Sequence, residues 1–429
     1  MSSLKIINKK TETGYLLVLV LVFGSIFLAI ITAFVGNVVT QNQLVNFKVE
    51  QQKATDIAEA GLNYYRWFLA HYPGDVTDGT GVPGPYVHTY ADPEGSTIGE
   101  FSLEVASSTY CGDISSIDIS STGYTYAEPE AVATVNGRYA RPSIASYSFI
   151  TNSNVYYGAT SNVSGPIHSN QGIRMEATHN SIVSSGQINW SCGPSYGCTP
   201  TTTVAGVYST GGNATPALFS FPAPPIDFGG ITLNLASMQD KAQNSGGLYF
   251  GPSGKQGYQL IFLPGSRVEV RRVNSKQAEP NGVAWGYYLN VLNGTSLIGT
   301  YNITYVTADS GLLAVAEYDM LMGLEIPTNF VLNGIFVAQN GYFGRNNYEY
   351  AKFPAAWNSY KVRNSLTING TIVTNGRAAN TYTSSGTVKS GFLTRTYSYD
   401  TSLVFDPPPY TPNSSDVYSF FNWRLDGGD

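Results

Sequence analysis

Residues Tyr15–Val39 of this chain, YLLVLVLVFGSIFLAIITAFVGNVV, form one apolar run without a charged side chain. As an α-helix with a rise of 1.5 Å per residue, the run would be about 37 Å long, which is enough to cross the hydrocarbon core of a bilayer with some tilt. No later stretch of the 429 residues is comparable. The sequence therefore predicts one membrane-spanning helix near the N-terminus.

The charges on either side of this run predict its orientation. Lys5, Lys9 and Lys10 precede it, and the first charge after it is Lys48. Because positive residues stay on the cytoplasmic side of a membrane helix, we expect a cytoplasmic N-terminus and an exported remainder. A cleaved secretory signal fits less well, since the run exceeds the usual apolar region of about 7–15 residues. An ordinary single-pass anchor fits the composition equally well.

The helix is predicted to continue beyond the membrane. From Thr40 to Leu69 the chain has no proline, and Gly61 is its only glycine. Apolar side chains recur here mostly at spacings of three to five, which predicts one apolar face on a helix: Val45, Val49, Ala54, Ile57, Ala58, Leu62, Tyr65 and Leu69. Pro73 and Gly74 end the pattern. We expect one helix over residues 15–72, half embedded in the membrane and half an amphipathic stalk.

The N-terminal region resembles a known family. A short basic leader that ends in Gly14, a long apolar helix and the run QKATDIAEAGLNYYRW (Gln52–Trp67) are similar to the N-terminus of PilX-type minor pilins, which are type IV pilin-like proteins. Ala58–Leu62 matches a recurrent stretch late in the first helix of that family. The resemblance covers residues 1 to about 72. It implies an N-terminal helix that assembles with the helices of other subunits.

The resemblance also implies processing. A prepilin peptidase would cut between Gly14 and Tyr15, so that residues 1–14 are a leader peptide and Tyr15 is the first mature residue. Major pilins carry a glutamate at the fifth mature position, where this chain has Leu19, and they carry Phe or Met more often than Tyr at the first. These departures resemble the minor and tip-forming branches. The implied function is a non-enzymatic minor or tip subunit of a type IV pilus or related filament, held in the inner membrane before assembly and bound to other pilin subunits afterwards.

Residues 73–142 are predicted to form a small antiparallel sheet. A loop rich in Pro, Gly and Asp opens the region, and alternating strands follow at Glu100–Val105, Ile117–Ser121 and Ala131–Val135. The tripeptide Asn136-Gly137-Arg138 is typical of a tight turn or a bulge. We expect this sheet to cover the apolar face of the stalk, which is also the usual pilin arrangement.

Residues 143–429 are predicted to form a large extracellular β-domain. Three segments share the pattern strand, small-Gly, strand and then Asn-Gly or Asn-x-Gly: VSGPIHSNQG (163–172), VLNGIFVAQNG (331–341) and LTINGTIVTNG (366–376). Short strands with Gly and Asn at corners are typical of a β-helix. A β-sandwich with Gly-rich hairpins is the alternative. The predicted fold class is therefore α+β, with β-helix-like or β-sandwich character in the large domain.

Two parts of this domain depart from the repeated pattern. An insertion is expected near residues 221–309, with a helical segment and three strands: Leu233–Ala242, Gln259–Leu263, Arg267–Val273 and Tyr301–Val306. In the tail, DPPPY (406–410) is expected to strap across the β-domain. An aromatic cluster is expected to close one end of that domain: Tyr418, Phe420, Phe421 and Trp423.

Composition excludes some classes of function. Charged residues make up 12% of the chain, about half of the usual share, and 29 acids outnumber 23 bases. A nucleic-acid partner is not expected, because such proteins carry a basic stripe. Cys192 and Cys198 could form a disulfide in an oxidising compartment. Cys111 would then be the odd cysteine, expected to be a small buried side chain rather than a reactive thiol.

No motif predicts a catalytic residue, a cofactor or a metal site. His168 and His179 are better explained as single histidines on neighbouring rungs than as a metal-binding pair. Glu317 and Asp319 would share one face of a strand, which is more typical of a solvated edge than of a catalytic carboxylate pair. A permanently anchored surface adhesin and, with less support, a membrane-tethered glycan-processing enzyme are the alternative functions.

The tyrosines are a further sign of function. Nine of them accompany a surface rich in Ser, Thr and Asn: Tyr156, Tyr157, Tyr342, Tyr348, Tyr350, Tyr360, Tyr382, Tyr397 and Tyr399. Tyrosine offers a large contact area and a polar tip, which suits a binding surface for a glycan or protein ligand. It is also a common strand residue, and the sequence favours that simpler interpretation.

Overall fold

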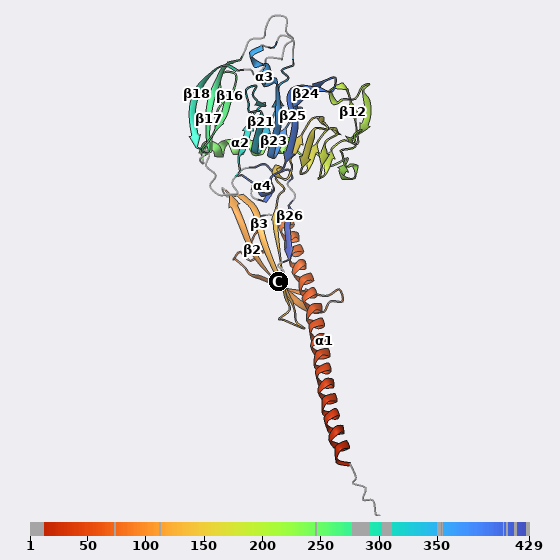
Figure 1. Cartoon of the computed structure of the whole chain (residues 1–429). Coiled ribbons are helices and arrows are strands. Elements are labelled where there is room, and N and C mark those ends of the chain that lie inside the picture. Colours follow the sequence, from red (N-terminus) through yellow and green to blue (C-terminus); the bar gives the residue numbers. More distant parts are fainter. Residues whose placement is uncertain are drawn as a thin grey trace, which may run out of the picture. The chain divides into compact units, whose positions relative to one another are not determined.

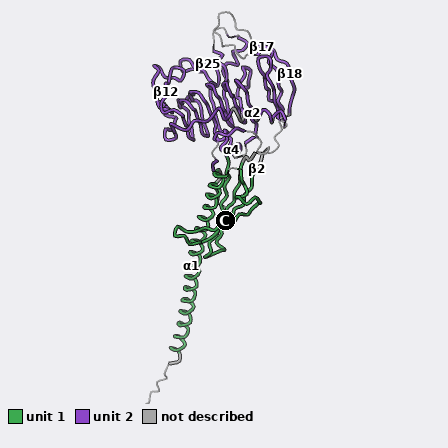
Figure 2. Tube along the Cα trace, turned by 180° about the vertical axis from the view of Figure 1, so that it is seen from behind, with its two compact units in different colours: residues 1–140, 420–429 green, residues 141–419 purple. Residues whose placement is uncertain are grey.

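A computed structural model describes residues 13–425 apart from 73, 111–112, 245–246, 277–291, 303–310, 350–352, 354, 406, 409–410 and 416–417. The chain divides into two compact units, which Figure 2 shows in different colours. Unit 1 contains the chain up to Ala140 and again from Phe420, and unit 2 contains Arg141–Ser419. In sequence, unit 2 is therefore an insertion within unit 1.

Unit 1 is built on one long helix, α1 (Thr13–His71), of 59 residues (Figure 1). Its interior has no proline, and helix-favouring Leu and Ala recur along its whole length, joined by Gln, Lys and Glu from Gln41 onward. The helix ends where Tyr72 N donates to Phe68 O at 2.8 Å and Gly74 takes a φ of 94°, a conformation that favours glycine. The long N-terminal helix expected from the sequence is present.

Within the described residues, the sheet of unit 1 has five strands in the order β1-β2-β3-β4-β26. Their bounds are β1 (Tyr86–Ala91), β2 (Thr97–Tyr110), β3 (Asp113–Thr125), β4 (Val132–Ala140) and β26 (Ser419–Leu425). The first four pair antiparallel. Alternate side chains of the central strands are buried, Leu103, Ile119 and Val135 among them. This alternation is what a sheet with one covered face requires.

Glycines in the sheet let α1 approach it closely. A Cβ at Gly123 would lie 2.4 Å from Ala54 O and 2.6 Å from Ala58 N, both backbone atoms of the helix. The buried residues of α1 face the same strands, with Ile57 and Leu62 almost fully covered. The sheet therefore covers the stalk as expected, and the backbone of α1 packs directly against it.

Two sequence predictions about unit 1 are wrong. Asn136-Gly137-Arg138 is neither turn nor bulge but continuous β4, with Gly137 opposite Ile119. Glycine leaves room there for the Phe420 ring, which a Cβ would approach to 3.1 Å. The tail from Phe420 does not close the β-domain predicted over 143–429: it forms β26 of unit 1, where the Phe420 ring packs 5.0 Å from Tyr139.

Unit 2 contains an 11-stranded sheet in which, among the described strands, every pairing except β24–β25 is parallel. Its strands are β5 (Phe149–Thr151), β7 (Ser161–Ser164), β8 (Ile167–Ser169), β10 (Thr178–His179), β11 (Val183–Ser185), β15 (Phe219–Ser220), β19 (Leu313–Ala316), β21 (Asn329–Ala338), β23 (Val362–Thr374), β24 (Thr381–Ser384) and β25 (Thr387–Ser398). The fold class is α+β.

Smaller sheets complete unit 2. Parallel pairs join β6 (Val155–Tyr157), β9 (Ile173–Met175) and β14 (Val207–Tyr208), and also β20 (Met320–Met322) and β22 (Phe343–Arg345). β12 (Asn189–Cys192) and β13 (Thr202–Ala205) form an antiparallel pair. Short helices are α3 (Asn358–Lys361), α4 (Thr401–Phe405) and the 3-10 turns η1 (Ile144–Ser146), η2 (Pro194–Tyr196), η3 (Pro216–Leu218) and η4 (Ala355–Trp357).

Two of the three repeated segments lie on neighbouring strands of the 11-stranded sheet. VLNGIFVAQNG and LTINGTIVTNG lie in β21 and β23, which pair in parallel with Gly334 opposite Gly370. Both glycines have a positive φ, of 126° and 132°, and a Cβ at Gly370 would lie 2.0 Å from Gly334 O. The third segment contributes β7 and β8, which pair with β25 and with β5. The two most similar segments are therefore adjacent strands in register.

The expected insertion near 221–309 contains the predicted elements with shifted bounds. The helix is α2 (Phe228–Asn244), and the strands β16 (Tyr258–Leu263), β17 (Arg267–Lys276) and β18 (Leu292–Asn302) form an antiparallel sheet. The strand predicted over Tyr301–Val306 overlaps only the end of β18, since residues 303–306 lie outside the described residues. Three of the five residues of DPPPY, residues 406, 409 and 410, lie outside them too.

Candidate functional site

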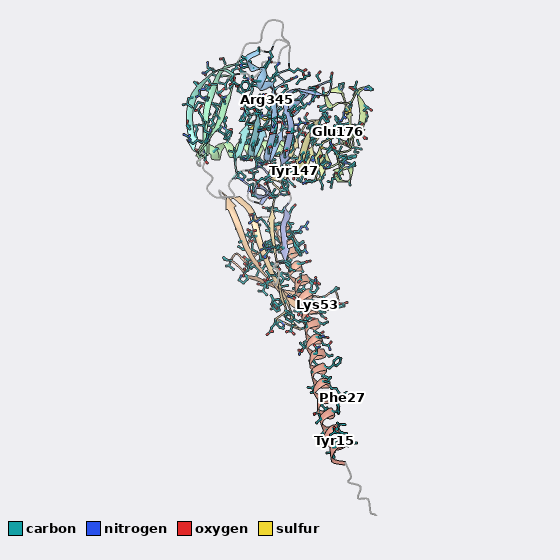
Figure 3. All side chains as sticks on the ribbon, in the orientation of Figure 1. Tyr15, Phe27, Lys53, Tyr147, Glu176 and Arg345 are labelled. Carbon is teal, nitrogen blue, oxygen red and sulfur yellow. A yellow bond between two sulfur atoms is a disulfide. The ribbon has the colours of Figure 1, made fainter. Side chains whose placement is uncertain are left out.

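Helix α1 has two halves with opposite surroundings. From Ala54 onward one face of the helix is buried: Ala54, Ile57, Ala58, Leu62, Tyr65, Phe68 and Leu69, whereas Trp67 on the other side is 53% exposed. Between Tyr15 and Val49 its large apolar side chains are exposed, with 75% of Tyr15 and 63% of Phe27 accessible (Figure 3). The candidate functional surface is this exposed apolar half, which we call the apolar segment (residues 15–49).

Glu50 lies at the boundary between the two halves. Its Oε1 accepts from Lys53 Nζ at 2.7 Å, and its Oε2 accepts from Thr125 Oγ1 at 2.7 Å, at the end of β3. The sequence places Val45 and Val49 on the covered face of the stalk, and this is wrong: they are 58% and 48% exposed. The sheet begins to cover the helix only at Glu50, so the uncovered part of α1 is longer than the apolar run, and its last ten residues are mainly polar and include Lys48.

Exposing the apolar segment to water is energetically unfavourable. Burying apolar area is favourable by about 25 cal/mol per Å², and this segment exposes large side chains on every side of the helix. Length and composition qualify α1 as a helix able to cross a membrane, and none of its most apolar window is buried within the protein. The apolar part of α1 is therefore long and apolar enough to cross a membrane.

The predicted processing site lies at the start of this segment. Gly14 and Tyr15 fall in the first turn of α1, and Tyr15 is exposed. Residues 1–12 of the predicted leader lie outside the described residues, as does Cys111. Cleavage between Gly14 and Tyr15 stays a prediction.

Cys192 and Cys198 form a disulfide in unit 2, with their Cα atoms 5.6 Å apart. The bond closes the loop between β12 and β13, and two arginines hold that loop from outside. Arg174 Nη1 donates to Tyr196 O at 3.0 Å, and Arg377 Nη2 donates to Ser195 O at 2.6 Å. The loop is thus fixed at both its sulfur atoms and its backbone carbonyls.

The two histidines singled out by sequence have separate roles. His168 is buried, with Nδ1 2.9 Å from Ser184 Oγ and Nε2 2.9 Å from Asn170 Oδ1. Its burial lowers the pKa of the imidazole. His179 is also buried, with Nε2 accepting from Thr215 N at 3.0 Å. Within the described part of the chain no group of three His, Cys, Asp or Glu side chains is placed to hold a metal ion.

Glu317 and Asp319 do not share a strand face, contrary to the sequence prediction. Both lie in the bend between β19 and β20. Glu317 O accepts from Asn340 N at 2.9 Å, and Asp319 Oδ1 accepts from Tyr342 N at 3.0 Å. Their polar groups tie this bend to the following one, which is the turn chemistry expected where parallel strands end.

The tyrosines divide between interior and surface. Tyr157, Tyr348 and Tyr397 are buried, whereas Tyr156 is 41% exposed and Tyr350 lies outside the described residues. Tyr157 and Tyr397 pack edge to face with Phe149, with centroids 5.7 and 6.1 Å from it. Alternation along short strands sends successive tyrosines to opposite faces, so composition alone overstated the tyrosine-rich surface.

An open groove of about 810 Å³ runs over the sheet of unit 1. Glu104, Asp118, Arg138 and the half-exposed Trp423 are among its lining residues. Arg138 Nε donates to Asp118 Oδ1 at 2.7 Å, so these two charges partly neutralise one another. Two of the charged side chains that line the groove are thus paired with each other.

Comparison with known proteins gives little. No protein-family model matches the chain, and no curated protein matches it. Among solved structures, the competence-associated pilin ComZ from Thermus thermophilus matches at a TM-score of 0.26 and 11% sequence identity, over 88% of this chain and 98% of that chain. At that TM-score the likeness carries no argument about fold or function, which have to rest on the residues of this chain.

Sequence reasoning missed the charged side chains buried in unit 2, because they belong to no motif. Glu176 is 5% exposed and accepts from Arg174 Nε at 2.9 Å, Thr210 N at 3.0 Å and Ser209 Oγ at 3.0 Å. Arg345 is fully buried (Figure 3), and Arg363 is 6% exposed. From the sequence, Arg363 could have been singled out only as a charged residue that lies just before the repeated segment 366–376.

Proposed function

We propose that this protein is a non-enzymatic minor or tip subunit of a type IV pilus or related filament. The observation that carries the proposal is the division of α1 into a half packed on its own sheet and an apolar segment with no cover inside the protein. A single helix of this construction supplies an anchor for a membrane and, later, an apolar surface for the helices of other pilin subunits.

The proposed pathway has three stages. The chain inserts with its N-terminus in the cytoplasm, as the preceding lysines favour, and is held in the inner membrane. A prepilin peptidase then removes residues 1–14. The apolar segment finally leaves the bilayer for a bundle of like helices, where Gly24 and Gly36, with no other atoms within 4 Å of a built Cβ, allow close helix approach.

The PilX-type minor role rests on the mature N-terminus. Leu19, at the fifth mature position, is 41% exposed and carries no charge with which to pair the terminal amine of a neighbouring subunit. A subunit of this kind suits a place that does not repeat along the shaft. The remainder of the chain, outside the membrane and at the pilus or cell surface after assembly, would then serve assembly or adhesion.

We further propose that unit 2 is a β-helix-like display domain stabilised by its disulfide after export. Support comes from pairings that recur every 16 to 18 residues: β5 with β8 and β8 with β11, β6 with β9, and β7 with β10. Three short strands per turn, each stacked on its equivalent in the next turn, are what a β-helix requires.

Processing by a prepilin peptidase tests the proposal. Co-expression with the peptidase should give a mature protein that begins at Tyr15, read by N-terminal sequencing, and the variant Gly14→Val should keep Met1 because the residue before the scissile bond no longer fits. An inactive peptidase is the matched control. Recovery of intact Met1 from the unaltered chain beside active peptidase would refute the pilin role.

Assembly separates this role from a permanent anchor. Sheared filaments should contain the mature chain, and Phe27→Arg, in the apolar segment, should remove it from them. Phe262→Arg, at a half-exposed position of unit 2, is the control and should leave it there. A mature chain found only in the membrane fraction would support the permanently anchored adhesin instead.

A further inference from the structure

One face of the 11-stranded sheet of unit 2 carries rows of short, uncharged side chains. Strands β21, β23, β25, β7 and β10 are neighbours in this order and pair in parallel, and Figure 1 labels the first three. Side chains that are opposite one another in such a register lie on the same face of the sheet. A middle row crosses all five strands and contains Val331, Thr367, Thr396, Asn162 and Thr178.

Two outer rows flank the middle row, each two residues away along the strands: Asn329, Ser365 and Thr394 in one, and Asn333, Asn369, Ser398 and Ser164 in the other. The residues between the rows point to the core, where Leu366, Ile368 and Tyr397 are buried. The side chains of the rows are exposed or half-exposed, and none is charged. We call the three rows together the neutral face.

Hydrogen bonds along the outer rows hold their side chains in place. Asn369 Nδ2 donates to Asn333 Oδ1 at 2.9 Å, and Ser398 Oγ donates to Asn369 Oδ1 at 2.7 Å. In the other outer row Ser365 Oγ donates to Asn329 Oδ1 at 2.9 Å. Side-chain ladders of this kind stabilise flat sheets, whereas most sheets twist. A ligand of the neutral face would therefore meet side chains that are already ordered, which lowers the entropy cost of binding.

The threonines of the middle row are left for water. Among the hydrogen bonds of the described residues, none uses Thr367 Oγ1 or Thr396 Oγ1. Each threonine also presents a methyl group, and branching at Cβ restricts its χ1 angle. The middle row thus holds hydroxyl and methyl groups at fixed positions, with the hydroxyl groups hydrated.

The sheet sets the spacing of these groups. Neighbouring strands lie about 4.8 Å apart, and residues two apart along a parallel strand lie about 6.6 Å apart. Both repeats are close to the spacing of oxygen atoms on the prism face of hexagonal ice. Water bound to hydroxyl groups at this spacing is held in an arrangement close to that of ice.

We propose that the neutral face binds ice, through water molecules ordered by the middle row. Thr367, Thr396 and Thr178 supply the hydroxyl groups, and the outer rows keep the sheet flat on either side. An exported subunit with this face would attach a filament or a cell to ice. The inference goes beyond the filament role, and its failure would leave processing and assembly untouched, because those depend on α1.

A crystalline polysaccharide is the other regular surface that such rows could match, and the residues favour ice. Sugar rings stack on aromatic side chains, and the three rows contain none. A protein partner would need an apolar centre, whereas Val331 is the one aliphatic side chain of the rows. An ionic ligand would need a charge, which the rows lack.

Partition into ice tests the proposal. Full-length protein in detergent is held against a slowly growing ice surface, with ovalbumin in the same detergent as the reference. The protein should be enriched in the ice, whereas ovalbumin should stay in the liquid. Enrichment no greater than that of ovalbumin would overturn the proposal. Retention on microcrystalline chitin or cellulose, without enrichment in ice, would overturn it in favour of a polysaccharide.

Variants locate the ice-binding surface. Thr396→Tyr places a ring in the centre of the middle row and should lower enrichment in ice to the level of ovalbumin. Thr203→Tyr, at an exposed position of β13, is the matched control and should leave enrichment unchanged. If circular dichroism shows that Thr396→Tyr fails to fold, Thr178→Tyr, exposed on the edge strand β10, should also lower it. Enrichment of the folded variant equal to that of Thr203→Tyr would overturn the assignment to the neutral face.

Discussion

Unit 2 buries a charged pair and a fully enclosed arginine, whereas two of the three described ion pairs of unit 1 stay partly exposed and the third buries Asp78 beside His88. In unit 1 the pairs Lys53–Glu50 and Arg138–Asp118 keep between 16% and 51% of each side chain exposed. In unit 2 Arg174 and Glu176 expose 13% and 7%, and Arg345 exposes nothing. Unit 1 is therefore stabilised mainly by apolar contact between helix and sheet, whereas unit 2 depends on buried polar groups that each need a partner.

The units also differ in how far apart in sequence their contacts lie. The sheet of unit 1 up to β4 pairs each strand with its neighbour in sequence. In unit 2, Asn152 Nδ2 donates to Asn375 Oδ1 across 223 residues at 2.9 Å, and β23 pairs with β5. Contacts between residues this far apart in sequence form late in folding, because the entropy cost of closing the loop comes before the free energy gained from strand pairing.

The largest expected effect breaks the close contact of unit 1. Gly123→Ala would place a methyl group against the backbone at Ala54 and Ala58, so the helix has to move off the sheet. We expect a loss of about 3 kcal/mol in the stability of unit 1, at the upper end for overpacking. Differential scanning calorimetry of the full-length protein should show the transition of unit 1 lowered and that of unit 2 unchanged.

The same substitution in open space is the control. Gly212 lies in unit 2 with no other atoms within 4 Å of a built Cβ, so Gly212→Ala should leave both transitions within about 0.5 kcal/mol of the unaltered protein. A Gly123→Ala protein as stable as this control would show that the helix and sheet of unit 1 are not in backbone contact.

The comparison explains what sequence could predict. Helix α1 was predictable because an uncharged apolar run and a helical spacing are local signals. The strand Ser419–Leu425 was not, since nothing in its sequence indicates that it returns to β4 across the whole of unit 2. The prediction of a turn or bulge at Gly137 was wrong for a related reason: the side chain that lies against this glycine, Phe420, is distant in sequence.

The candidate sites show the same limit. The apolar segment was visible in the sequence, but its end at Glu50 was set by a hydrogen bond from Thr125, a residue of another element. Arg363 belongs to no motif, and the sequence does not indicate that it is buried with the Tyr360 ring over its guanidinium, 4.5 Å away. Sequence periodicity reports the face on which a residue lies and says nothing of what covers that face.

A smaller effect is expected from a buried charge of unit 2. Burial would raise the pKa of Glu176, but hydrogen bonds from Thr210, Arg174 and Ser209 outweigh it and hold the pKa below the ordinary 4.5. The unfolded chain then takes up the proton at a higher pH than the folded one. The stabilisation is present at neutral pH and is lost as the pH falls below about 4.5.

Glu176→Gln tests this dependence. We expect the variant to lose about 2 kcal/mol at pH 7, as for hydrogen bonds to a charged group, and the difference to shrink by pH 3. Thermal unfolding at both pH values measures it. Glu94→Gln, at an exposed turn of unit 1, is the control and should change neither value. A Glu176→Gln penalty that is the same at pH 3 and pH 7 would contradict a role for the charge.

The smallest expected effect separates two buried hydroxyl groups that share one aromatic cluster. Tyr397 Oη accepts from Asn380 Nδ2 at 3.0 Å, whereas Tyr157 Oη is buried without a partner. Tyr397→Phe should cost about 1 kcal/mol because it leaves Asn380 Nδ2 unpaired, and Tyr157→Phe should be neutral or slightly stabilising. Both changes keep the edge-to-face packing, whose ring centroids lie 6.1 Å apart. Urea unfolding of the two variants measures the difference, and an equal penalty would show that unit 2 depends on its rings rather than on its buried polar partners.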